Sequence, residues 1–183
     1  MKLLKINKLL KDLNNNKIIA MPTETVYGFF SLISLENLKN INKLKGRELE
    51  KPLQVFFLDF SQIEKYTKLS QFQKQILIQE LPGNKSFLVP SSSFFKKLTN
   101  QNTILIRLPI WEQKILKNTK KVFEKINVPL FATSANLTNN KEFDNGKLIQ
   151  KEFKINGFNK KIKTKKSSII ISLLEDKVEI IRN

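Results

Sequence analysis

The sequence predicts an α/β protein, a single domain of residues 1–183 in which helices pack on an open sheet that is parallel in part. Its length fits one domain with a sizeable core. Short apolar runs also alternate with segments of helical apolar spacing for most of the chain. Since we find neither an internal repeat nor a dividing linker, we expect one domain.

Four segments have the apolar spacing of an amphipathic helix. They are residues 2–13, 34–44, 61–80, which holds one or two helices, and 110–126. Ser34 is expected to cap the second segment, because a serine hydroxyl accepts a hydrogen bond from a free N–H at a helix start. Gly46, just past the end of this helix, is expected in the left-handed conformation.

Short apolar runs next to turn residues predict strands at 17–21, 53–58, 87–90, 103–109, 129–133, 168–171 and 177–182. We expect the last two to form a hairpin across residues 174–176. Residues 22–28 are dense in hydroxyls and are expected to form a loop. Residues 138–166 are polar and rich in lysine, and we expect them to be irregular.

The composition excludes several classes of protein. Without cysteine the chain forms no disulfide and no thiolate metal site. Without histidine it lacks both the commonest general base and the commonest metal ligand. We therefore expect no protein-bound metal. No apolar run reaches the ~18 residues that span a bilayer, and lysines interrupt the apolar residues of the N-terminus. We therefore expect a cytoplasmic protein without a membrane partner.

The formal net charge of +17 has two explanations. Lys, Asn, Ile and Phe are abundant throughout, and the lysines are scattered, as in a compositionally biased genome. The alternative is a preference for an anionic partner, ATP or tRNA. Only Arg47, Arg107 and Arg182 are arginines among the 33 basic residues. Since only arginine offers a planar fork for a phosphate or carboxylate, these three are candidate ligand contacts, the alternative being surface ion pairs.

Polar residues gather where predicted strands end or helices finish, which is where ligands collect in open α/β sheets. These segments are 23–28, 45–47, Arg107 and 133–136. They offer cations, hydroxyls and an amide, which suit an anionic substrate. No glycine-rich phosphate loop is present. The residues alone indicate an enzyme or binding protein for a phosphorylated ligand, while helix caps and turns explain most exposed hydroxyls equally well.

An ordered set of motifs resembles the YrdC family of threonylcarbamoyl-AMP synthases. The motifs are Pro22-Thr-Glu-Thr-Val-Tyr-Gly28, Lys45-Gly-Arg47, Lys51-Pro-Leu53, Leu81-Pro-Gly83, Ile106-Arg-Leu-Pro109, Thr133-Ser-Ala-Asn136, Ser167-Ser-Ile-Ile170 and Arg182. They extend over residues 17–182 and include all three arginines. The resemblance implies a twisted YrdC-like sheet with a concave, basic cleft, in the short form that has no C-terminal extra domain.

The resemblance also implies roles for individual residues. Its catalytic signature corresponds to Lys45, Arg47, Ser134 and Asn136. Its ATP contacts correspond to Arg47, Lys51, Thr103, Ser134 and Arg182. Its threonine contacts correspond to Thr25, Tyr27, Arg107, Thr133 and Ser167, with Arg107 pairing the carboxylate. Phe56 and Asn84 depart from the family, which often has histidine and usually has proline at these positions.

The implied reaction joins L-threonine, bicarbonate and ATP, with Mg²⁺ assisting, into threonylcarbamoyl-AMP. A TsaD-type transferase would then use this product to form N6-threonylcarbamoyladenosine in tRNA. Direct contact between this chain and tRNA is left open. One alternative is a YrdC-like protein that binds RNA and catalyses nothing. Others are carbamoyl transfer in metalloenzyme maturation and a synthase for a different amino acid.

Overall fold

Nine strands form one mixed sheet in the computed structural model, which describes residues 2–163 and 168–182. The strands are β1 (Ile19–Pro22), β2 (Tyr27–Leu32), β3 (Gln54–Phe56), β4 (Lys85–Pro90), β5 (Thr103–Arg107), β6 (Leu130–Ser134), β7 (Asn156–Gly157), β8 (Ile169–Ser172) and β9 (Glu179–Arg182). Their order is β7-β1-β2-β6-β3-β5-β4-β8-β9. The pairs β1–β7, β3–β5 and β4–β8 are parallel and the others antiparallel, so the predicted α/β class with a partly parallel sheet is confirmed.

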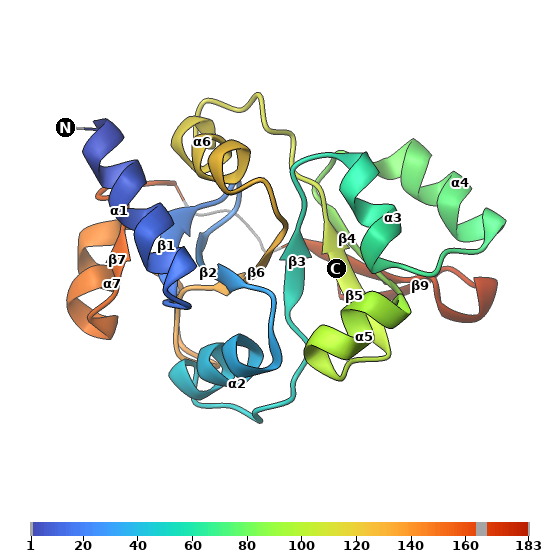
Figure 1. The fold of residues 1–183 in the computed structure, drawn as a ribbon. Helices are drawn as coiled ribbons and strands as arrows, with labels where there is room; N and C mark the ends of the chain where they lie inside the picture. The colour runs from blue at the N-terminus through green and yellow to red at the C-terminus, as the bar shows by residue number, and fades with distance from the viewer. Residues whose placement is uncertain (1, 164–167, 183) are drawn as a thin grey trace.

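The helices pack around this sheet (Figure 1). They are α1 (Lys2–Asn14), α2 (Leu35–Leu44), α3 (Ile63–Tyr66), α4 (Gln71–Glu80), α5 (Ser93–Thr99), α6 (Lys117–Ile126) and α7 (Gly146–Phe153), with 3-10 turns η1 (Phe60–Gln62) and η2 (Leu174–Asp176). Figure 1 shows α1 and α7 at the β7 end of the sheet, and α3 and α4 toward the β9 end. In the part of the chain that the structure describes, no helix is long and apolar enough to cross a bilayer.

Two apolar clusters hold these layers together. The larger contains buried residues of α1 to α6 and of most strands, and the smaller packs Ile149 of α7 against Tyr27 and Phe29 of β2. Successive side chains of a strand point to opposite faces, so Gly28 and Phe30 lie on the other face of β2 from Tyr27 and Phe29. This alternation decides which residues of the 22–28 motif reach the cleft described below.

Several local predictions are confirmed. Ser34 caps α2 by accepting a hydrogen bond from Asn37 N, and Gly46 has a φ of +64°. The strands β8 and β9 form the expected antiparallel hairpin.

Other predictions were wrong. The prediction that residues 22–28 form a loop that ends at Gly28 is wrong at its end, because Tyr27–Leu32 form β2. Helices α5 and α7 were missed, because each buries few residues and α7 lies in a polar stretch. The helix expected from residue 110 begins only at Lys117; before it, buried Trp111 donates a hydrogen bond to Phe57 O at 3.1 Å.

Candidate functional site

A cleft of about 270 Å³ lies over β2, β6, β3 and β5. It brings together seven of the residues predicted to bind ligand: Thr25, Arg47, Lys51, Arg107, Thr133, Ser134 and Arg182. These residues come from segments far apart in the chain, and the sheet order makes them neighbours. The predicted basic cleft is therefore present, with four of its lining residues cationic.

Strand register sets the floor of the cleft. Gln54 of β3 lies beside Leu105 and Ala132, and Phe56 lies beside Arg107. Lys51 precedes β3 at the Gln54 end, whereas Arg107 lies at the Phe56 end. Two residues along a strand span about 6.6 Å, so Lys51 and Arg107 enter the cleft at different ends of β3.

Lys45 holds the turn after β6 in place and does not itself line the cleft. Its ammonium donates to Ser134 O at 2.7 Å, Asn136 O at 2.8 Å and Asn136 Oδ1 at 2.9 Å, with Ser134 Oγ at 3.3 Å. Ser134 Oγ in turn donates to Asn136 Oδ1 at 2.7 Å. The structure thus joins Lys45, Ser134 and Asn136 in one network, in which only Ser134 lines the cleft.

Burial disfavours the charged form of this lysine. Desolvation first, and then the positive charge of Arg47, lower the pKa of Lys45 to about 8, against a smaller raising effect of Glu142. Since an ammonium has three protons, its four neighbouring acceptors leave none for a ligand. In this arrangement the protons of Lys45 are directed at Ser134 and Asn136, and Lys45 holds Ser134 at the edge of the cleft.

Arg47 faces the cleft just past the end of α2. Its Nε donates to Asn42 Oδ1 at 2.7 Å, and its two terminal nitrogens have no hydrogen-bond partner among the described residues. Asn42 also donates to Leu49 O and Lys51 O, at 2.8 Å each, and so shapes the loop that presents Lys51. Burial lowers the pKa of Arg47. The role of Asn42 was missed, because its place on a helix gave no signal in the sequence.

Arg182 borders the cleft from β9. Its Nη2 and Nε donate to Ser168 O at 2.7 and 3.2 Å, and desolvation lowers its pKa against a smaller raising effect of the Glu142 charge. A polar chain continues from Ser168 Oγ to Ser86 Oγ at 3.0 Å, and Gln54 Nε2 donates to the same Ser86 hydroxyl. Among the described residues no carboxylate lies within ion-pair distance of Arg47, Lys51 or Arg182. Their charges are therefore available to an anion.

Arg107 differs from these cations because it is fully buried and already paired. Its Nε and Nη2 donate to Glu24 Oε1, the first at 3.0 Å, and its Nη2 donates to Asn84 Oδ1 at 2.9 Å. In the described part of the chain, Arg107 Nη1 and Glu24 Oε2 are buried atoms without a hydrogen-bond partner. The partnership of Arg107 with Glu24 was not predicted from the sequence.

The loop between β1 and β2 is held by a hydroxyl turn. Thr23 Oγ1 donates to Val26 O at 2.6 Å and accepts from Thr25 N and Val26 N at 3.2 Å each. Thr25 Oγ1 lies 3.1 Å from Thr23 Oγ1. Both threonines line the same cleft as Arg107.

Four other predicted residues lie outside this lining, and a fifth lies outside the described residues. Tyr27 points to the opposite face of β2, where its hydroxyl donates to Phe158 O at 3.0 Å and Lys160 O at 2.8 Å. Burial raises its pKa to about 12. Thr103 begins β5 outside the lining, as Lys45 and Asn136 also lie outside it. Ser167 lies outside the described residues, and its neighbour Ser168 lines the cleft.

The lining offers little to a metal ion. It contains no carboxylate within the described residues, and these residues hold no cluster of three or more potential metal-ligating side chains. Because Mg²⁺ is usually bound through one or two carboxylates together with substrate phosphates, the protein side of this cleft does not fit a resident Mg²⁺. The cleft fits an extended anion held by side-chain cations.

The chain is similar in sequence to known proteins. The Sua5/YciO/YrdC family model, described as telomere recombination, matches residues 11–183. A putative threonylcarbamoyl-AMP synthase from Methanocaldococcus jannaschii is 29% identical, over 95% of this chain and 83% of its own length. The threonylcarbamoyl-AMP synthase from Buchnera aphidicola subsp. Schizaphis graminum is 36% identical, over 72% of this chain and 70% of its own.

Solved structures show the same fold. YciO from E. coli superimposes with a TM-score of 0.82 at 17% identity, over 100% of this chain and 90% of its own. Sua5 from P. abyssi, in complex with L-threonine, superimposes with a TM-score of 0.83 at 24% identity, over 98% of this chain. The chain spans only 54% of that Sua5 chain.

Proposed function

The chain belongs to the Sua5/YciO/YrdC family, and on that premise we propose that it is a threonylcarbamoyl-AMP synthase. Such an enzyme joins L-threonine, bicarbonate and ATP and releases pyrophosphate. The names of the two relatives support the proposal, as does the complex of P. abyssi Sua5 with L-threonine.

The division of charge in the cleft is the observation that carries the proposal. Arg47, Lys51 and Arg182 have no acidic partner within the described residues and suit a polyphosphate. Arg107 is balanced by Glu24 and has one nitrogen to offer, which suits a single carboxylate. One cleft that takes both kinds of anion fits an enzyme that joins a nucleotide to an amino acid.

The chemistry needs no protein nucleophile. The amine nitrogen of threonine bonds to the carbon of CO₂ derived from bicarbonate and loses a proton, which gives N-carboxythreonine. An oxygen of that new carboxylate attacks the α-phosphorus of ATP, and the bond from this phosphorus to the bridging oxygen of pyrophosphate breaks. Catalysis then rests on holding two mutually repelling anions in line.

The residues divide this work. Arg47, with Lys51 and Arg182, neutralises the charge that grows on the phosphates. Arg107 holds the threonine carboxylate next to the hydroxyls of Thr23 and Thr25. Ser134 lines the cleft and is held in place by its hydrogen bond with Lys45. Its hydroxyl would contact the reacting groups. The nucleotide enters as MgATP, with the metal bound by its phosphates and water.

The product, threonylcarbamoyl-AMP, carries an activated carbamoyl group that must be transferred to an acceptor. We propose that a separate TsaD-type transferase moves it to tRNA to give N6-threonylcarbamoyladenosine.

The proposal predicts that Arg47→Ala abolishes most activity. Losing one charge-assisted donor to the developing charge costs roughly 2 to 4 kcal/mol, a fall of about 10²- to 10³-fold in kcat. The measurement is pyrophosphate release from ATP, Mg²⁺ and bicarbonate, with and without L-threonine. Release that needs both threonine and bicarbonate and collapses in the variant is expected. Folded, ATP-binding protein with no threonine-dependent release refutes the proposal.

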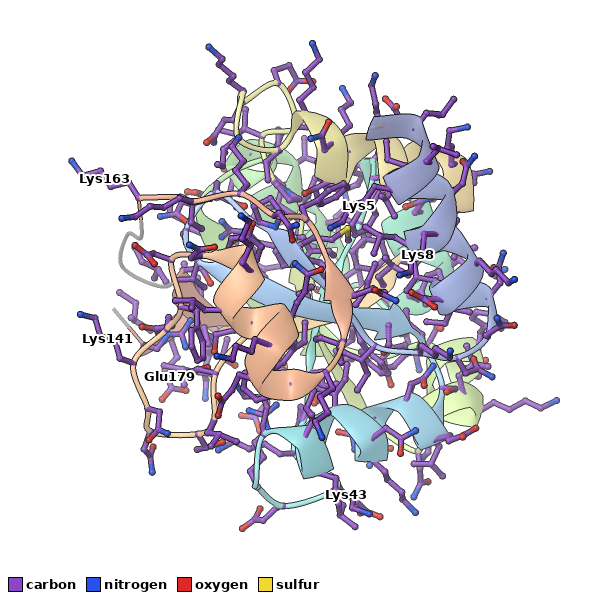
Figure 2. All side chains as sticks on the ribbon, turned by 90° about the vertical axis from the view of Figure 1, so that its left-hand side faces the viewer. Lys5, Lys8, Lys43, Lys141, Lys163 and Glu179 are labelled. Atoms are coloured by element: carbon purple, nitrogen blue, oxygen red, sulfur yellow. The ribbon has the colours of Figure 1, made fainter. Side chains whose placement is uncertain are left out.

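A second candidate, RNA binding without catalysis, is favoured by one observation, the net charge of +17. Of the lysines labelled in Figure 2, Lys43, Lys141 and Lys163 point outward from the end of α2 and from the connections on both sides of α7. This dispersed charge forms a general anion-attracting surface and explains neither the buried Arg107 nor the Lys45 network. We therefore favour the synthase.

A further inference from the structure

The buried pair of Glu24 and Arg107 has a geometry that bears on which anion binds there. A guanidinium has one edge formed by Nε and Nη2 and an end formed by Nη1 and Nη2. Glu24 Oε1 accepts hydrogen bonds from this edge, and Asn84 Oδ1 accepts a further hydrogen bond from Nη2. Nη1 is the nitrogen that remains without a partner among the described residues.

Glu24 also balances the charge of Arg107. The Glu24 side chain is 6% exposed and the Arg107 side chain 1% exposed, so water screens neither of them. A dianionic phosphate placed at Nη1 would face a nearby carboxylate in a poorly screened site, which is unfavourable. A zwitterion carries one carboxylate for Nη1 and one ammonium that the negative charge of Glu24 attracts.

The cations proposed to bind phosphate, Arg47 and Arg182, have no buried carboxylate beside them among the described residues. Among the described residues, Arg47 and Arg182 donate to neutral oxygens, those of Asn42 and Ser168, and the carboxylate of Glu142 acts on Arg182 without lying within ion-pair distance. The cleft therefore contains cations of two kinds, with and without a buried counter-charge.

We propose that Glu24, with Asn84, sorts the anions in this cleft by making Arg107 a receptor for the carboxylate of an α-amino acid and not for a phosphate. Glu24 does not line the cleft, so it acts through Arg107 as a positioning residue. The inference rests on the proposed function, because it assigns the amino-acid end of the same cleft.

Two nearly isosteric substitutions change the charge at Arg107 in opposite directions. Glu24→Gln removes the counter-charge while keeping an oxygen that accepts from the guanidinium. Asn84→Asp adds a second carboxylate at an exposed position and leaves the buried pair intact. The matched control is Glu64→Gln, the same chemical change in an exposed pair with Lys74.

The experiment is a calorimetric titration with L-threonine, with and without a non-hydrolysable ATP analogue. It is repeated with increasing inorganic phosphate at constant ionic strength. In the wild type and in Glu64→Gln, phosphate should leave threonine binding unchanged. In Glu24→Gln, phosphate should compete and raise the apparent Kd for threonine on the order of tenfold. In Asn84→Asp, the Kd for threonine should rise on the order of tenfold without phosphate.

The outcomes separate the two proposals. A wild type that binds no threonine under either condition refutes the proposed function. A wild type that binds threonine, together with folded Glu24→Gln that phosphate does not affect, refutes the sorting role alone. If Glu24→Gln does not fold, Asn84→Asp decides the matter, and unchanged threonine affinity in that variant overturns the inference.

Discussion

Lys45 shows how a single buried cation can shape a site that it does not enter. Its ammonium lies within hydrogen-bond distance of four oxygens of Ser134 and Asn136, the farthest at 3.3 Å. A neutral amine has one proton fewer and cannot satisfy the same set. The position of the Ser134 hydroxyl therefore depends on the charge of Lys45.

This dependence predicts a loss of activity in mild alkali. Lysine is charged below its pKa and neutral above it, and burial lowers the pKa of Lys45 from 10.5 to about 8. Pyrophosphate release should decline as the pH rises through that value, as the network loses its ammonium. Lys45→Arg is the control, because a guanidinium stays charged across this range.

The threonine amine also titrates in this range, so the readout is the ratio of wild-type to Lys45→Arg activity. This ratio should fall as the pH rises through about 8. A ratio that stays constant with pH would show that the charge of Lys45 is not needed.

The limits of sequence reasoning are clearest at this scale. The arginines, the Lys-Gly-Arg segment and Ser134 were found because they are rare or resemble a family motif. Glu24 and Asn42 act through a neighbour and left no pattern in the sequence, since their partners are set by tertiary contacts. Tyr27 was assigned to the amino-acid pocket by resemblance, but strand alternation turns its side chain to the other face.

At the scale of elements, β2 has two faces with different tasks. Gly28 lines the cleft, where a Cβ atom would come within 2.8 Å of the Phe30 ring. On the other face, the Tyr27 hydroxyl ties β2 to the segment that follows α7, through Phe158 O and Lys160 O. The strand thus joins the cleft to the smaller apolar cluster.

Tyr27→Phe tests this division. The substitution removes the hydroxyl, whose single proton the carbonyl oxygens of Phe158 and Lys160 share and which also accepts from Lys160 N, and this loss costs about 1 to 3 kcal/mol of stability. Urea unfolding should detect the loss, while the KM for threonine should change little. An unchanged unfolding midpoint together with a raised KM would instead support the pocket role that the family resemblance implies.

Elements were predicted best where burial gives a clear period. The strands β3, β5 and β6 and helix α2 were found because their apolar residues face one core. The missed elements α5 and α7 are short and largely exposed, and their positions depend on what they pack against. The glycine of β2 concealed a strand, because the close approach of Phe30 that favours glycine there is visible only in three dimensions.

At the scale of the whole molecule, the positive charge is general and the cleft is specific. Lys43 at the end of α2, and Lys141 and Lys163 on the connections before and after α7, lie well apart from one another (Figure 2). Such a surface attracts polyanions by counterion release, with little dependence on sequence.

We therefore predict that any RNA binding is separable from catalysis. The affinity for a short single-stranded RNA should fall steeply with salt, and it should be the same with and without threonine. Arg47→Ala should alter it little, because one cation among the 33 basic residues is lost. Fluorescence anisotropy at several salt concentrations measures this, and RNA binding that requires Arg47 would place the polynucleotide in the cleft.

The most direct test of the synthase proposal is detection of its product. The protein is incubated with MgATP, L-threonine and ¹³C-bicarbonate, and the mixture is analysed at once by mass spectrometry. We expect a threonylcarbamoyl-AMP species that is heavier by the label and depends on threonine, and that is absent with Arg47→Ala. Folded wild-type protein that binds ATP and threonine but forms no labelled adenylate would contradict the proposed function.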